Sequence, residues 1–260
     1  MDPGLLFIPG PVPLPPEVRE ELAKAALPHY GDAWVKAHSE AHDLLRYLWS
    51  APDAHVFPIA GPGHAALEAI AYTFLRPGDR VVVVSNGFFG ERTHEVLQSH
   101  RVKAEVVASP WGAAPDLAKL RAALKTPTKA VVFVHNETST GVTNALEPIV
   151  EAAHAADAFV VVDAVSSLGG LPLPFGKLGI DAGFTAVGPP AHPSNTVACL
   201  TPPTGVDPMR LVRRLKEEHN IYISGGLGPL RGKTIRIGTM GTQADLETID
   251  WLLKAMRASL

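Results

Sequence analysis

The sequence has few of the features that define several classes of protein. It holds one cysteine, Cys199, among 260 residues, which excludes an internal disulfide framework and fits a reducing compartment. Charged residues make up 19% and the net charge is −3, which argues against a nucleic-acid-binding surface. No apolar run approaches the ~20 residues of a membrane span, and Met1 to Pro9 lack the regions of a signal peptide. We therefore expect a cytoplasmic protein without membrane or nucleic-acid partners.

The sequence does contain ample material for a hydrophobic core. Hydrophobic residues make up 46% of the chain, which excludes extensive disorder. The length fits one large α/β domain, or a core domain joined to a smaller one. Residues 1–16 are rich in proline and are expected to form an extended arm.

Short apolar runs alternate with helical patterns through most of the chain that follows the arm. Strands are expected at 56–59, 80–84, 104–107, 130–134, 159–162 and 182–187. Because these runs are apolar on both faces and are separated by helices, they predict a mostly parallel sheet. We interpret residues 17–188 as a large α/β domain.

The pattern changes after Asp181, and the Gly188–Pro193 stretch is the expected boundary of a second domain. The remaining expected elements are strands at 196–200, 221–224 and 235–237 and helices at 207–219 and 244–259. Residues 189–260 are therefore interpreted as a small α+β C-terminal domain.

Two runs carry the strongest functional signal. The first is His135-Asn136-Glu137-Thr138-Ser139-Thr140-Gly141, and the second is Val160-Val161-Val162-Asp163-Ala164-Val165-Ser166. Asp163 ends an apolar strand, at the edge where open α/β sheets bind their ligands. A carboxylate there is costly to bury unless it has a cationic partner. The alternative interpretation of Asp163 is a helix N-cap or a solvated strand end.

Weaker signals surround these runs. Gly61-Pro62-Gly63-His64 begins a predicted helix and is typical of a phosphate cradle, although an ordinary β–α turn has the same pattern. Arg236, between two isoleucines, has the planar guanidinium that binds carboxylates, although an arginine on a strand is commonly a surface charge. The eleven histidines are interpreted as structural or surface residues without ligand spacing, and no metal site is predicted.

Together these runs resemble the class V aminotransferases, pyridoxal-phosphate (PLP) enzymes of fold type I that include the alanine–glyoxylate and serine–glyoxylate aminotransferases. The resemblance covers most of residues 5–187 and 194–258. It implies one catalytic residue, Asp163, which would pair with the pyridinium nitrogen of the cofactor. It implies the following further contacts: Gly63 and His64 with the phosphate, Phe89 and Val165 on the two ring faces, Thr138 near the phenolic oxygen, and Arg236 with the substrate carboxylate.

The resemblance also implies a homodimer that transfers an amino group from alanine or serine to glyoxylate or pyruvate. One essential residue is missing, because such enzymes form a Schiff base with a lysine. This lysine normally follows the Gly179-Ile180-Asp181 run, yet the sequence has none between Lys177 and Lys216. Neither Lys177 nor Lys233 matches the lost residue. We expect an internal deletion, no covalent cofactor attachment and little or no turnover.

Two other interpretations remain open. One is a non-catalytic remnant that binds the cofactor or a partner. The other is a PLP-family lyase or desulfurase, which the position of Cys199 in the small domain disfavours because it lies outside any reactive loop.

Overall fold

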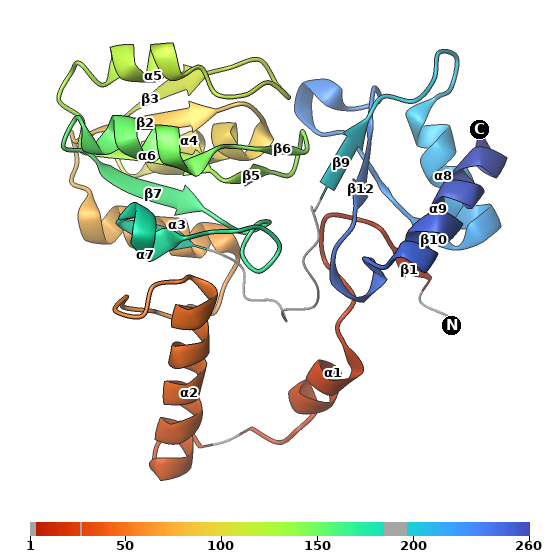
Figure 1. Ribbon diagram of the computed structural model, residues 1–260, viewed down its shortest axis with the longest axis horizontal. Helices are drawn as coiled ribbons and strands as arrows, with labels where there is room; N and C mark the ends of the chain where they lie inside the picture. The colour runs from red at the N-terminus through yellow and green to blue at the C-terminus, as the bar shows by residue number, and fades with distance from the viewer. Residues whose placement is uncertain (1–3, 27, 185–196) are drawn as a thin grey trace.

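The computed structural model describes residues 4–26, 28–184 and 197–260 (Figure 1). A sheet flanked by helices forms one unit, and the C-terminal elements together with the start of the chain form another. Within the described ranges, no helix is both long enough and apolar enough to cross a membrane.

The first unit is built on a parallel sheet of five strands in the order β3-β2-β4-β7-β8. The strands are β2 (Arg80–Ser85), β3 (Lys103–Ala108), β4 (Ala130–Val134), β7 (Phe159–Asp163) and β8 (Ala182–Phe184). The register pairs Val134 of β4 with Asp163 of β7, so both strands end at the same edge. This topology confirms the predicted α/β class and the mostly parallel sheet.

Two helical layers cover the sheet because its central strands are apolar on both faces. Val81 and Val83 pack with α3 (Gly63–Phe74) and α4 (Phe88–Ser99). Val82 and Val84 pack on the other face with α5 (Leu117–Ala123) and α6 (Leu146–His154). All four valines are at most 2% exposed, so their burial from water is the main force that holds the layers together.

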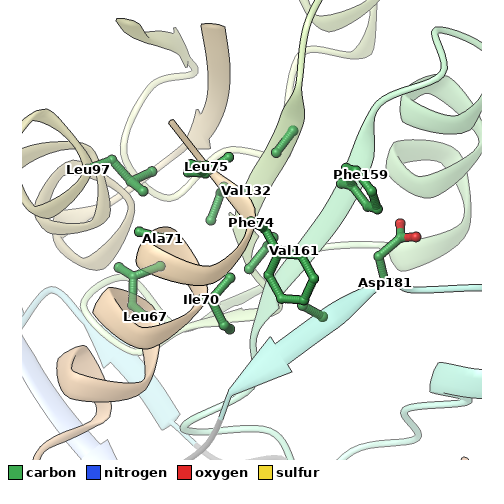
Figure 2. A pocket seen from close by; sticks show the side chains of 12 residues that line it. Leu67, Ile70, Ala71, Phe74, Leu75, Leu97, Val132, Phe159, Val161 and Asp181 are labelled. Atoms are coloured by element: carbon green, nitrogen blue, oxygen red, sulfur yellow. The ribbon is translucent and has the colours of Figure 1, made fainter. Parts of the chain in front are cut away.

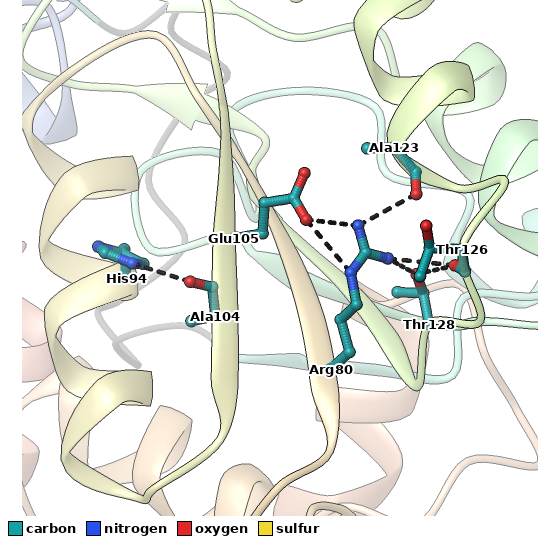
Figure 3. A network of polar contacts seen from close by, with 7 residues as sticks. All are labelled: Arg80, His94, Ala104, Glu105, Ala123, Thr126 and Thr128. Atoms are coloured by element: carbon teal, nitrogen blue, oxygen red, sulfur yellow. Dashed lines mark hydrogen bonds and ion pairs between the residues drawn. The ribbon is translucent and has the colours of Figure 1, made fainter.

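At the amino ends of the strands, Arg80 joins several segments (Figure 3). Its guanidinium pairs with Glu105 of β3 and donates hydrogen bonds to the carbonyl oxygens of Ala123 and Thr126, each at 3.1 Å, and to the hydroxyl of Thr128. The planar fork reaches all of these acceptors at once. Arg80 thus ties β2 to β3 and to the α5–β4 turn, at the edge opposite the end of β7.

The sequence did not predict a short hairpin after β4, at the carboxyl ends of the strands, or a short helix before β8. β5 (Asn136–Glu137) and β6 (Val142–Thr143) form a hairpin directly after β4. α7 (Phe175–Leu178) precedes β8. The hairpin is tied to the segment after β7, because Asn136 Nδ2 donates to the carbonyl oxygen of Ser166 at 3.2 Å.

The C-terminal unit contains an antiparallel sheet in the order β11-β12-β9. Its strands are β9 (Val197–Leu200), β11 (Ser224–Gly225) and β12 (Ile235–Gly238). Two helices, α8 (Pro208–His219) and α9 (Leu246–Ser259), contribute to its core. β10 (Ile221–Tyr222) pairs in parallel with β1 (Leu5–Leu6) of the proline-rich arm, and Phe7 is fully buried in this core.

Several local expectations differ from the structure. The strand predicted at 56–59 is wrong: no strand forms there, and Phe57 is 79% exposed. Pro58 lacks the N–H that a ladder needs, so this apolar run adds poorly to a sheet. α1 (Pro16–Leu22) and α2 (Asp32–Leu48) contain no buried residue. The whole Gly188–Pro193 boundary region and residues 185–187 of the strand predicted at 182–187 lie outside the described residues.

An apolar cavity of about 90 Å³ lies between α3 and the β4–β7–β8 part of the sheet (Figure 2). Leu67, Ile70 and Phe74 line it from the helix, and Val132 and Val161 line it from the strands. It contains none of the predicted site residues, and its lining is almost entirely hydrocarbon. We assign it to imperfect packing along α3.

Candidate active site

The candidate site lies at the carboxyl ends of β4 and β7, where Asp163 is its most unusual group. The side chain of Asp163 is 8% exposed and accepts one hydrogen bond from Val165 N at 2.9 Å. No cationic side chain pairs with it among the residues that the structure describes. Burial raises the pKa of Asp163 to about 7; the bond from Val165 lowers it, and the charge of Glu137 raises it further. Asp163 is therefore neither a helix N-cap nor a solvated strand end.

The start of α3 lies against the segment that follows Asp163. A methyl group on Gly63 would stand 3.1 Å from Cγ2 of Val165, so the two residues are in contact. Val165 is 42% exposed, so one face of its side chain is open to a ligand. The first N–H groups of α3 have no side-chain cap, since the N-cap is Pro62. This helix end can accept an anion.

His64 adds a neutral imidazole to the same helix end. Burial lowers the pKa of His64, the nearby charge of Arg92 lowers it further, and Glu68 raises it. Arg92, which the sequence analysis did not single out, thus brings a guanidinium near the N-terminus of α3, although it also pairs with Glu95 at 2.7 Å. Both groups are suited to an anionic ligand at this end of the helix.

Phe89 and Thr138 come from two segments that contact each other directly. Phe89 is half-buried in the first turn of α4, with its ring edge-on to Phe88 at a centroid distance of 5.4 Å. Thr138 is 9% exposed in the turn between β5 and β6. The N–H of Phe89 donates to Glu137 Oε2 at 3.1 Å, so helix and hairpin are joined next to both predicted ligand contacts.

The residue that joins them is Glu137, for which the sequence predicted no role. Its side chain is fully buried. Ser139 donates to Oε1 from its amide at 3.1 Å and from its hydroxyl at 2.6 Å, while Gly90 N donates to Oε2 at 3.1 Å. A glutamate in the middle of a polar run gives no sequence signal of burial, because burial here depends on α4 lying against the hairpin.

Arg236 reaches the same region from the C-terminal unit. It is 9% exposed, and its Nε donates to the carbonyl oxygen of Gly225 at 3.0 Å. No described residue accepts a hydrogen bond from its two Nη groups. Burial lowers the pKa of Arg236, and the nearby Cys199 and Glu137 partly offset that effect. A buried guanidinium with its outer nitrogens unused is suited to a carboxylate ligand, which excludes an ordinary surface charge.

The hairpin also brings the two units into contact. Gly141 in its turn has φ +72°, and a side chain there would lie 2.7 Å from the carbonyl oxygen of Val197 in β9. Cys199 stands opposite Arg236 in the β9–β12 ladder. The predicted residues therefore come from both units, and the hairpin that carries Glu137 contacts β9 of the C-terminal unit through Gly141.

The prediction that the histidines lack ligand spacing is wrong for one pair, which lies four residues apart. His38 and His42 lie one turn apart on α2, with ring centroids separated by 4.2 Å. Within the described ranges, no group of three or more histidine, cysteine, aspartate or glutamate residues is arranged to hold a metal ion.

Comparison with known proteins identifies the family of this chain. The family model for aminotransferase class V matches residues 17–188. The small subunit of soluble hydrogenase from Synechococcus sp. is 36% identical over 185 residues, which are 69% of this chain and 48% of that protein. An alanine–glyoxylate aminotransferase from Callithrix jacchus is 24% identical over 361 positions, covering 98% of this chain and 87% of that protein.

A solved structure of alanine–glyoxylate aminotransferase from Nostoc sp. superposes with a TM-score of 0.90 at 25% identity, covering 98% of this chain and 95% of that one. In several matches the chain spans about half the length of the curated relative, as it does for the Synechococcus protein. Family and fold together imply pyridoxal phosphate as the cofactor. The chain belongs to the class V aminotransferase family.

Proposed function

We propose that this chain binds PLP without covalent attachment, at the carboxyl ends of β4 and β7, and that it turns over amino acids slowly or not at all. The observation that carries the proposal is Asp163, a buried carboxylate at a sheet edge with no cationic partner among the described residues. A protonated pyridine nitrogen is the partner that such a carboxylate lacks.

The residues around Asp163 fit the remaining parts of the cofactor. Gly63 and His64 at the uncapped start of α3 would hold its phosphate. Val165, in contact with Gly63, and Phe89 would pack on its ring faces, and Thr138 would approach its phenolic oxygen. The bound cofactor supplies an electron sink for carbanion chemistry.

The protein side chains have separate tasks in this proposal. The Asp163 carboxylate accepts a hydrogen bond from the ring nitrogen and keeps its proton in place. Arg236 binds the carboxylate of a small amino acid or 2-oxo acid through its two Nη groups. Alanine or serine as donor, with glyoxylate or pyruvate as acceptor, is the proposed substrate class. The names of the Callithrix and Nostoc relatives support alanine and glyoxylate.

This chain has no lysine at the position where the family forms its Schiff base, between Lys177 and Lys216. The alignment with the Callithrix relative extends over 361 positions, 101 more than the 260 residues of this chain, which supports an internal deletion. We place the deletion near residues 187–194, just where the family match ends at residue 188. No lysine hydrogen-bonds or pairs with the proposed site residues in the described part of the chain.

The proposal includes the domain division at residue 188, a homodimer and a cytoplasmic location. The dimer is supported by α2, which exposes Val35, Leu44 and Tyr47 to 60% or more. The single cysteine fits the cytoplasm.

The purified chain, incubated with PLP, alanine and glyoxylate, is expected to form pyruvate no faster than PLP alone, because no residue is positioned to shuttle the substrate proton. Coupled detection of pyruvate measures this, with a complete class V aminotransferase as the positive control. A turnover of about 1 s⁻¹ or more, the lower end for ordinary enzymes, would refute the proposed inactivity. It would not contradict the proposed cofactor site.

A further inference from the structure

Two helices begin at the edge of the sheet near Asp163, and their N-termini differ in one respect. α3 starts without any side-chain cap. The first N–H groups of α4 are instead taken up by the β5–β6 hairpin: Phe88 N donates to Ser139 Oγ at 2.9 Å, and Phe89 N and Gly90 N both donate to Glu137 Oε2 at 3.1 Å. An anionic ligand therefore finds free donors at α3 and none in the first turn of α4.

The chemistry of this contact requires a carboxylate. Glu137 Oε2 accepts from two helix amides, and Oε1 accepts from the amide and the hydroxyl of Ser139. All four partners are donors, and only a carboxylate accepts on both oxygens. A glutamine would turn an NH2 group toward either α4 or Ser139, where it meets another donor.

The packing around this carboxylate leaves it no room to move. A methyl group on Gly87 would lie 2.4 Å from Glu137 Cγ and 2.6 Å from Ser139 Oγ, so α4 starts in direct contact with the hairpin. Glu137 is fully buried, and Ser139 likewise has no exposed surface. We call these two residues, with the α4 amides that they bind, the Glu137–Ser139 clamp.

We propose that Glu137 is a positioning residue of the cofactor site, which fixes Phe89 and Thr138 in the relative placement that the cofactor ring needs. Thr138 lies between Glu137 and Ser139 in the sequence, and the N–H of Phe89 donates directly to Glu137 Oε2. This inference rests on the proposed function, since it assumes that the ring lies between these side chains. Glu137 acts through the other two residues and does not itself touch the cofactor.

The electrostatic setting agrees with this role. The charge of Glu137 raises the pKa of Asp163 and that of Arg236, so the carboxylate lies within electrostatic reach of both predicted ligand-binding groups. A buried charge that is hydrogen-bonded four times is held in one place and contributes a fixed field at the site.

Glu137→Gln tests the inference through cofactor binding and backbone exchange. We expect the Kd for PLP to rise about tenfold, and the circular dichroism that the protein induces in bound PLP to fall at saturation. Amide hydrogen exchange of Phe89 and Gly90 should become faster. Asp116→Asn is the matched control, because Asp116 caps α5 through Ala118 N and Lys119 N at 3.1 and 3.0 Å. Asparagine keeps the single oxygen that accepts both bonds, so exchange in α5 and PLP binding should both stay as in the wild type.

Ser139→Ala provides a milder second variant if Glu137→Gln does not fold, and it should weaken PLP binding in the same direction. A Glu137→Gln protein with faster α4 exchange but wild-type Kd and wild-type circular dichroism would overturn the inference, because Glu137 would then be only structural. If the wild-type chain itself fails to bind PLP, the proposed function fails, and the exchange data still report whether the clamp exists.

Discussion

The Asp163→Asn variant is expected to be more stable than the wild-type chain at pH 8, by on the order of 4 kcal/mol at most, and about equally stable at pH 4. This figure follows from the change in pKa from 3.8 in the unfolded chain to about 7 in the folded one, at about 1.4 kcal/mol per pKa unit. Asparagine keeps the acceptor for Val165 N and cannot ionise.

The sign follows from proton binding. Between pH 4 and pH 7 the folded wild-type chain retains a proton on Asp163 that the unfolded chain has released. The stability of the wild-type chain therefore falls as pH rises through this window and levels off above it. Asparagine does not titrate, so the stability of the variant should not fall between pH 4 and pH 7 for this reason.

The same substitution should weaken PLP binding about 100-fold at pH 8. A buried partner for the ring nitrogen would be lost, and breaking a buried ion pair costs several kcal/mol. Denaturant unfolding from pH 4 to pH 8, with and without PLP, measures both effects. Asp181→Asn is the control, since Asp181 accepts from Val160 N at 2.8 Å at the other end of β7. An Asp163→Asn protein with unchanged PLP affinity would contradict the assignment of Asp163.

Arg236→Met is expected to reduce the affinity for glyoxylate, or for its inert analogue oxalate, by about 100-fold without loss of stability. The two Nη groups form a charge-assisted fork for a carboxylate, whereas methionine fills similar space and removes a buried charge. Isothermal titration of the PLP-loaded protein measures the affinity.

Two further variants separate the causes of this loss. Arg236→Lys keeps the charge but loses the fork, so it should recover only part of the affinity. Arg257→Met removes an exposed arginine from α9 and should change neither affinity nor stability. If Arg236→Met bound glyoxylate as well as the wild type, Arg236 would have no role in substrate binding.

The sequence predicted the sheet well because the signal was local. The central strands β2, β4 and β7 are buried and read as continuous apolar runs, and the alternation of strands with helices allows few topologies. Asp163 could be identified in the same way, because a carboxylate that ends a buried strand has a predictable position at the sheet edge.

What the sequence did not predict depends on contacts between distant segments. The role of Glu137 arises from α4, about fifty residues earlier, whose first turn lies against the hairpin. The strand expected at 56–59 failed for the opposite reason, since its apolar run found no partner strand. The burial of Arg236 likewise depends on the β9–β12 ladder and not on its neighbouring residues.

The most direct test of the central claim is borohydride reduction of the wild-type chain with PLP, followed by intact and peptide mass spectrometry. A cofactor bound only by the side chains around Asp163 predicts retention of PLP before reduction, and no stoichiometric pyridoxyl adduct afterwards. A single adduct on one lysine would contradict the claim and would identify the residue that replaces the missing one.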